Sequence, residues 1–125
     1  MLSVSPAYRY YLYRGQADMR KSFDGLSGLV RNEFQKDPLS GGVFIFINKR
    51  CNQVKLLLWE GDGFSLYYKR LEKGTYELPS WNEHTTSVEL RSDELMLILQ
   101  GISLKSVRRR KRFHFQEKKS LNVLA

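Results

Sequence analysis

The stretch VFIFINKRCNQVKLLLWEGDGFSLYYKR at Val43–Arg70 decides the fold of this chain. Its first part, Val43–Ile47, is an uninterrupted apolar run that is too short for a helix and β-branched enough for a buried strand. Val54–Trp59 predicts a second strand. The turn sequence GDG at 61–63 is a strong hairpin signal before a third strand at Phe64–Arg70. The stretch therefore predicts an antiparallel β-meander.

Shorter strand candidates lie on both sides of the meander. Tyr8–Tyr13 (YRYYLY) is rich in residues that favour strands, and Gly15 ends the run. Thr75–Leu78 can supply a short fourth strand that is closed by Pro79. Val88–Leu90 has the composition of a short edge strand. The sheet is thus predicted to hold about four to five strands.

Two helices are predicted outside the meander. The first is capped by Asp18, because apolar residues recur at helical spacing between 19 and 34, and it stops near Lys36 before a loop. The second is capped by Ser92 and ends near Gly101. The predicted fold class is α+β: an antiparallel meander with one helix packed on it, a short C-terminal helix and a basic C-terminal arm.

The positive charge of the chain is concentrated at its end. Eight of the 21 basic residues and one of the 13 acidic residues lie in residues 105–125, so that segment carries +7 of the formal net charge of +8. We therefore predict a single α+β domain at 1–104 and a basic, flexible arm at 105–125. Basic arms most often bind nucleic acid, and the plain alternative is a solvated tail that aids solubility.

The chain has no feature of a membrane or secreted protein. No apolar run approaches the ~20 residues that a membrane span needs, and the N-terminus lacks the pattern of a signal peptide. The single cysteine, Cys51, cannot form an internal disulfide, which suits a reducing cytosol. We expect a cytoplasmic protein that associates with the nucleoid when it is bound to DNA, and no membrane partner.

The sequence does not predict catalysis. A nuclease or transposase of the three-carboxylate type needs acids from separate strands around a divalent metal. Here Asp18 is interpreted as a helix cap, Asp62 as a turn residue, and Asp24 and Glu72 as surface groups. The two histidines stand apart without zinc-ligand spacing, and no phosphate-binding glycine loop occurs. We therefore expect no catalytic residue, no metal and no cofactor.

Basic residues beside aromatic ones indicate nucleic-acid binding. Two cations lie at the predicted start of the first helix, where free N–H groups also attract anions. The predicted hairpin adds cations beside tyrosines that could stack on bases, although alternation places one of Tyr67 and Tyr68 in the core and favours packing of Trp59 there too. The candidate DNA-binding residues are Arg20, Lys21, Lys49, Arg50, Lys69, Arg70, Arg108, Arg109, Arg110, Lys111 and Arg112.

Four blocks of the sequence, taken in order and spacing, resemble one protein family. They are DMRKSFDGLSGLV, DPLSGGVFIFINKR, KLLLWEGDGFSLYYKRLEKGTYELP and LRSDELMLILQGI. From about Tyr8 to Arg112 the chain is similar to the TnpB-like accessory proteins (second reading frame, IS sixty-six type) of bacterial insertion sequences. It departs from that pattern at 77–79, where a tryptophan is expected before the proline.

The resemblance implies a role in DNA transposition beside a separate, larger transposase that carries the catalytic carboxylates. It implies no cofactor. Three readings follow for this chain: a non-enzymatic accessory protein that binds DNA, an adaptor that holds the transposase or another accessory protein without touching DNA, and a nuclease that uses Asp18, Asp62 or Glu72. The basic arm and the aromatic-basic hairpin favour the first reading.

Overall fold

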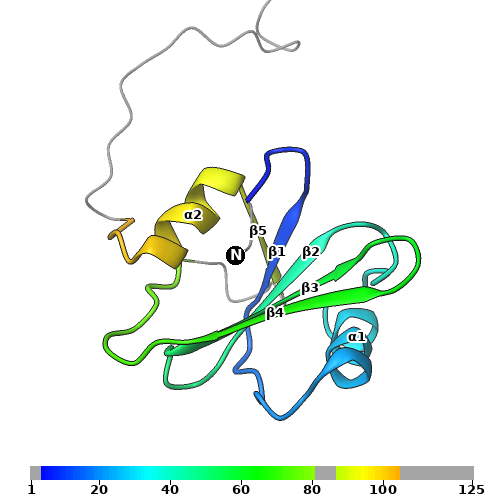
Figure 1. The fold of residues 1–125 in the computed structure, drawn as a ribbon, viewed down its shortest axis with the longest axis horizontal. Helices are drawn as coiled ribbons and strands as arrows, with labels where there is room; N and C mark the ends of the chain where they lie inside the picture. The colour runs from blue at the N-terminus through cyan, green and yellow to red at the C-terminus, as the bar shows by residue number, and fades with distance from the viewer. Residues whose placement is uncertain (1–3, 81–86, 105–125) are drawn as a thin grey trace, which may run out of the picture.

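The computed structural model describes residues 4–80 and 87–104 (Figure 1). The elements follow one another as β1 (Tyr10–Tyr13), α1 (Phe23–Asn32), β2 (Val43–Ile47), β3 (Gln53–Trp59), β4 (Phe64–Arg70), β5 (Ser87–Leu90) and α2 (Ser92–Gln100). The strands form one sheet in the order β4-β3-β2-β1-β5. The predicted α+β class is confirmed. No helix in this described part is long and apolar enough to cross a membrane.

The sheet is mixed, which corrects the prediction of a wholly antiparallel meander. β2, β3 and β4 form the predicted meander through two antiparallel pairings. β1, however, lies parallel to β2 and antiparallel to β5. The connection from β1 to β2 contains α1, and a crossover that carries a helix returns the chain to the end of the sheet where it began. The two strands therefore run in the same direction.

The prediction of a strand at Thr75–Leu78 is wrong. This segment is irregular, although its Tyr76 side chain is buried in the core at 3% exposure. The backbone N–H of Tyr76 donates to the carbonyl oxygen of Cys51 at 2.7 Å, which holds the segment beside the β2–β3 turn without a strand ladder. By contrast, the edge strand predicted at Val88–Leu90 is confirmed as part of β5.

The two helices cover opposite faces of the sheet, so both helices pack on it rather than one (Figure 1). Alternation along the central strands divides their apolar side chains between the faces. The α1 face buries Tyr11, Ala17, Leu26, Val30, Phe34, Phe44, Phe46 and Leu57. The α2 face buries Tyr10, Leu12, Val43, Ile45, Ile47, Val54, Leu56, Tyr76, Leu90, Leu95 and Ile98.

α1 is shorter than predicted at both ends. It begins at Phe23 with Ser22 as its N-cap residue, because Asp18 is engaged in a local turn with Arg20 instead of capping a helix. It ends at Asn32 rather than near Lys36. Just beyond its end Gln35 adopts a left-handed φ of 54°, and the N–H of Lys36 returns to the carbonyl oxygen of Val30 at 3.1 Å.

α2 begins one residue earlier than its predicted cap implies. Arg91, not Ser92, is the N-cap residue, and its backbone N–H donates to the Glu94 carboxylate at 2.9 Å. The helix ends as predicted, because Gly101 takes the left-handed φ of 77° that closes a helix.

Candidate nucleic-acid interface

Two turns meet at one end of the sheet. The N–H of Leu71, just after β4, donates to the carbonyl oxygen of Asn52 at 2.7 Å. This bond places the loop at 71–74 beside the β2–β3 turn at 48–52, and both turns lie at the lower left of Figure 1. The contact follows from the β3–β4 pairing, in which Gln53 is opposite Arg70.

Asn48 holds the β2–β3 turn in shape. Its side-chain Oδ1 accepts hydrogen bonds from the N–H groups of Asn52 and Gln53 at 3.0 and 2.9 Å. Its Nδ2 donates to Oδ1 of Asn52 at 2.7 Å. The two residues at the tip of this turn, Lys49 and Arg50, are exposed, so a rigid turn presents them to solvent.

The segment before α1 crosses the α1 face at the same end. The N–H of Ala17 donates to the carbonyl oxygen of Ile47, the last residue of β2, at 3.1 Å. Just after it in the chain, Arg20 and Lys21 are exposed. They therefore lie near the β2–β3 turn, but they precede the N-cap residue of α1 and are not in its first turn as predicted.

These contacts gather seven exposed cations, which we call the cationic end. Its members come from three separate parts of the chain: Arg20, Lys21, Lys49, Arg50, Lys69, Arg70 and Lys73. The acids near them are Asp18, Glu72 and Glu77. Within residues 4–80 and 87–104 only two of the seven cations form ion pairs, namely Arg20 with Asp18 at 2.8 Å and Arg70 with Glu72 at 3.0 Å.

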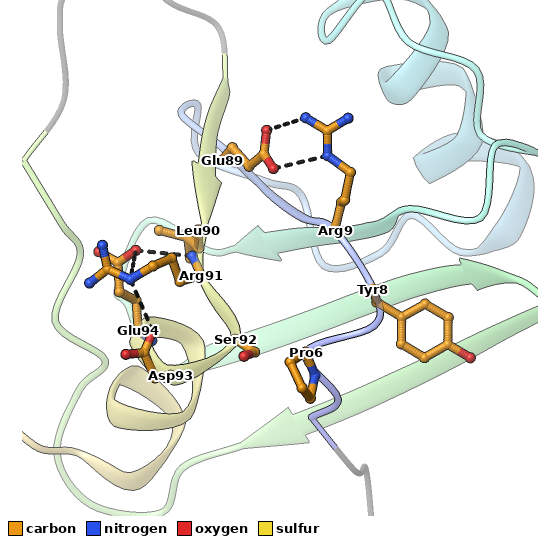
Figure 2. A pocket seen from close by; sticks show the side chains of 9 residues that line it. All are labelled: Pro6, Tyr8, Arg9, Glu89, Leu90, Arg91, Ser92, Asp93 and Glu94. Carbon is orange, nitrogen blue, oxygen red and sulfur yellow. Dashed lines mark hydrogen bonds and ion pairs between the residues drawn. The ribbon is translucent and has the colours of Figure 1, made fainter. Parts of the chain in front are cut away.

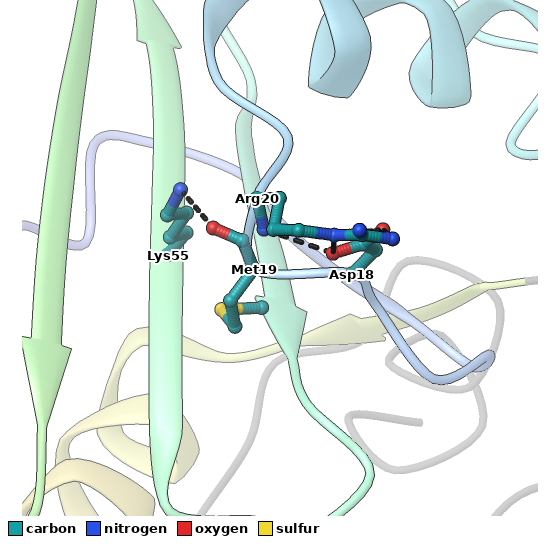
Figure 3. Close-up of polar contacts among 4 residues, drawn as sticks. All are labelled: Asp18, Met19, Arg20 and Lys55. Atoms are coloured by element: carbon teal, nitrogen blue, oxygen red, sulfur yellow. Dashed lines mark hydrogen bonds and ion pairs between the residues drawn. The ribbon is translucent and has the colours of Figure 1, made fainter.

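The ion pair of Arg20 also sets the charge state of Asp18 (Figure 3). The Asp18 carboxylate accepts hydrogen bonds from the Arg20 guanidinium at 2.8 Å and from the Arg20 backbone N–H at 2.9 Å. These hydrogen bonds lower the pKa of Asp18 from 3.8 to about 2. The Asp18 carboxylate therefore stays ionised and paired with Arg20 to a lower pH than an ordinary aspartate would.

Lys55 is a buried position behind the cationic end that the sequence reasoning missed. It lies on β3 and is only 5% exposed. Its Nζ donates to the carbonyl oxygen of Met19 at 2.8 Å (Figure 3). It also donates to the carbonyl oxygen of Lys21 at 2.6 Å. Its Nζ also lies 4.6 Å from the centre of the Tyr68 ring. The sequence does hold a signal for this position, because Lys55 stands between the apolar residues Val54 and Leu56 in a predicted strand. Lys55 fastens the segment that carries Arg20 and Lys21 to the sheet.

The aromatic-basic hairpin is divided by the geometry of β4. Lys69 and Arg70 are consecutive strand residues, so their side chains leave opposite faces of the sheet. Tyr67 packs against the core on the α2 face, whereas Tyr68 is 51% exposed, as the predicted alternation requires. Trp59 lies at the other end of β3, where its ring packs edge-on to Phe64 at 5.0 Å, away from the cationic end.

Lys73 belongs to the cationic end although it is not among the predicted residues. It follows β4 in the loop that the Leu71 hydrogen bond places beside the β2–β3 turn. The remaining candidates, Arg108, Arg109, Arg110, Lys111 and Arg112, lie outside the described residues. The last described residue, Leu104, packs against the core on the α2 face, and this end of the described chain lies on the left of Figure 1, as the two turns do.

The carboxylates considered for a nuclease are not brought together. Asp62 and Glu72 flank opposite ends of β4, a strand of seven residues, and are thus about 20 Å apart. Asp18 lies on the α1 face beside Arg20. Within the described ranges no group of three or more His, Cys, Asp or Glu side chains could hold a metal ion.

A hollow of about 620 Å³ opens beside the start of α2 (Figure 2). Its charged side chains are paired with one another: Arg9 with Glu89 at 2.7 Å, and Arg91 with Asp93 at 3.2 Å. The Arg9 guanidinium lowers the pKa of Glu89. Because its charges are already neutralised in pairs, this hollow offers an anion much less than the cationic end does.

The fold and its surface define a small α+β protein in which seven exposed cations are gathered at one end of a five-stranded mixed sheet. Over residues 8–109 the chain matches the family described as "IS66 Orf2 like protein", TnpB of the IS66 type. Since this match covers most of its length, the chain belongs to that family, whose members are accessory proteins associated with transposition.

Two relatives come from Sinorhizobium fredii (strain NBRC 101917 / NGR234). "Uncharacterized protein y4jC" is 28% identical over 110 residues, which cover 88% of this chain and 92% of the relative. "Uncharacterized protein y4hO" is 28% identical over 102 residues, which cover 82% and 87%. No solved structure matches the chain.

Proposed function

We propose that this protein assists transposition without catalysing a chemical step, by binding DNA through its cationic end. One observation carries the proposal: a body with a formal net charge of only +1 over residues 1–104 gathers seven exposed cations at one end of its sheet. Phosphate oxygens attract such clusters whatever the base sequence. The expected ligand is therefore the DNA backbone, at the ends of the element or in the target duplex.

The cations differ in how readily they can meet a phosphate. Lys21, Lys49, Arg50, Lys69 and Lys73 form no ion pair within the described part of the chain, so phosphate contact displaces only water and counterions. Arg20 and Arg70 already form ion pairs with Asp18 and Glu72, and a phosphate would have to share or replace these carboxylates. Phosphate contact at these two arginines therefore gains less binding free energy than at the other five cations. Among these positions we expect Lys49 and Arg50 to make the best-defined phosphate contacts, because the hydrogen bonds to Asn48 fix the backbone of their turn.

The basic arm supports the same proposal. It follows directly on the described domain and adds five consecutive cations at Arg108–Arg112. An arm supplies affinity without sequence information, whereas a rigid turn fixes the orientation of the protein on the duplex. We therefore propose that the arm supplies affinity for DNA, while the cationic end fixes the orientation of the protein on the duplex.

A salt series on labelled duplex DNA tests the proposal. The double variant Lys49→Ala/Arg50→Ala should bind more weakly, and its plot of log K against log salt should be flatter by about 0.9 for each phosphate that is no longer neutralised. The matched control is Arg31→Ala/Lys36→Ala, which removes the same charge from exposed positions in the last turn of α1 and just after it, at the helix end that faces away from Lys21 in the sequence. Equal behaviour of the two double variants would contradict the assignment of the site.

The second candidate function is that of an adaptor that binds the transposase without touching DNA. The near-neutral charge of residues 1–104 favours it over a purely electrostatic role. In high salt with nuclease present, an adaptor stays bound to the transposase, while an association that is bridged by DNA falls apart. Retention of the transposase by a protein that fails to bind duplex DNA would replace the first proposal with this one.

A further inference from the structure

β4 is an open edge of the sheet. It has seven residues and no proline, and within the described residues it pairs only with β3. The other edge strand, β5, is four residues long and carries Glu89, which is paired with Arg9. Short, charged edges resist further pairing, and long ones with free N–H and C=O groups invite it. β4 is thus the edge at which another strand can be added.

The hydrogen bonds show which backbone groups of β4 face outward. The N–H of Glu60 donates to the carbonyl oxygen of Gly63, and the N–H of Leu71 donates to Asn52, so hydrogen-bonded pairs recur at every second residue between these two. Residues 65, 67 and 69 therefore direct their groups at β3. The outward-facing residues are Phe64, Leu66, Tyr68 and Arg70.

These four residues are symmetric about Tyr67. An antiparallel copy of β4 that is centred on Tyr67 pairs Leu66 with Tyr68 of the second copy, and Phe64 with Arg70 of the second copy. Each outward residue then both donates and accepts a backbone hydrogen bond. No outward group of the strand is left without a partner.

The charges at the two ends of β4 select the same arrangement. The turn at 60–63 carries Glu60 and Asp62 and no cation. Residues 69–74 carry Lys69, Arg70 and Lys73 against Glu72. An antiparallel partner with this sequence sets the acidic turn of one copy against the basic end of the other, whereas a parallel partner sets like charges together.

We propose that the β4 edge is a homodimer interface, in which two copies of this chain join antiparallel about Tyr67 into one continuous sheet. Lys69 of each copy then lies opposite Ser65 of the other. The Ser65 hydroxyl already donates to the Glu60 carboxylate at 2.6 Å, so that carboxylate is next to the incoming lysine. On the α1 face, Arg70 of one copy lies opposite the ring of Phe64 of the other, a favourable pairing of a cation with an aromatic ring.

Site-specific cross-linking tests the register. At Tyr67 the two strands form a non-hydrogen-bonded pair with Cα atoms about 4.5 Å apart, within reach of a disulfide. In a full-length chain carrying Cys51→Ser and treated with nuclease, Tyr67→Cys should give a covalent dimer on mild oxidation. The matched control is Ser65→Cys in the same background, because two copies of that position would lie about 14 Å apart. Equal cross-linking of both, or of neither, overturns the proposal.

A charge exchange tests the contact itself. Lys69→Glu or Glu60→Lys alone should weaken the dimer about tenfold in sedimentation, because each change occurs twice across the symmetric interface. The combined variant Glu60→Lys/Lys69→Glu should restore dimerisation, since the attraction returns with its signs reversed. A wild-type chain that stays monomeric, or a combined variant weaker than both single ones, overturns the proposal. In this dimer Lys69 and Arg70 face the second copy, so the DNA contacts of the cationic end fall to its other five cations, and DNA binding is tested separately at Lys49 and Arg50.

Discussion

The ammonium group of Lys55, in the buried part of β3, donates a hydrogen bond of 2.8 Å to the backbone carbonyl oxygen of Met19, 36 residues earlier in the chain (Figure 3). A second bond of 2.6 Å reaches the carbonyl oxygen of Lys21. Backbone carbonyls, together with the face of the Tyr68 ring, thus replace the carboxylate that usually accompanies a buried lysine. These two hydrogen bonds, which we call the Lys55 clamp, hold the segment before α1 against the sheet although that segment is not part of the helix.

Replacing Lys55 by methionine should therefore destabilise the fold. Lys55→Met keeps an apolar stem of similar length but leaves two carbonyl oxygens without their donor, at a cost of about 2 kcal/mol in the free energy of unfolding. Urea unfolding followed by circular dichroism measures it. Lys73→Met, at an exposed lysine in the loop after β4 that has no ion pair among the described residues, should change the same quantity by less than about 0.5 kcal/mol. Similar losses in both variants would contradict the clamp.

The pH dependence of Asp18 offers a second test. Arg20 lowers the pKa of Asp18 from 3.8 to about 2, so the folded state favours the ionised carboxylate. The stabilisation is therefore complete above about pH 4 and is lost as the pH falls through about 2. An NMR titration of the side-chain carboxyl carbon should give a midpoint near 2, and Arg20→Gln should return it toward 3.8. Arg31→Gln, on the exposed side of α1, should leave the midpoint unchanged.

The sequence predicted the local elements well because each is encoded within a few residues. The apolar run of β2, the GDG turn before β4 and the glycine that closes α2 each satisfy a local requirement of backbone geometry. The parallel pairing of β1 and β2 could not be predicted in the same way, since it depends on where a long crossover returns the chain. Whether a segment such as Thr75–Leu78 joins a ladder also depends on neighbours that are distant in sequence.

The sequence identified single basic residues as candidates, but it did not predict that the fold gathers them on one surface. Each of the six described candidates lies at the cationic end, yet the reasons given for two of them do not hold, because Arg20 and Lys21 precede the helix instead of starting it. Lys55 and Lys73 were missed, since burial and turn-to-turn contact are tertiary facts. Whether these cations bind DNA stays a prediction.

Two buried tyrosines should respond differently to replacement by phenylalanine. The Oη of Tyr76 is buried without a hydrogen-bond partner among the described residues, and burial raises its pKa. Tyr76→Phe should therefore leave the free energy of unfolding unchanged or raise it by up to about 1 kcal/mol.

The Oη of Tyr10, by contrast, donates to the carbonyl oxygen of Ser5 at 2.7 Å and accepts from its N–H at 2.8 Å. Tyr10→Phe should lower the free energy of unfolding by about 1 to 2 kcal/mol. Chemical denaturation of both variants checks the contrast, and a loss at Tyr76 as large as that at Tyr10 would mean that the Tyr76 hydroxyl has a partner.

Truncation after Leu104 separates the arm from the cationic end in DNA binding. If five cations of the arm meet phosphates, the slope of log K against log salt should flatten by about 4 to 5 in the truncated chain. The binding that remains should then be the part that Lys49→Ala/Arg50→Ala weakens, because the domain keeps its own cations. Fluorescence anisotropy on one duplex across a salt series yields both slopes. A truncated chain whose residual binding is indifferent to Lys49 and Arg50 would assign the whole electrostatic contact to the arm.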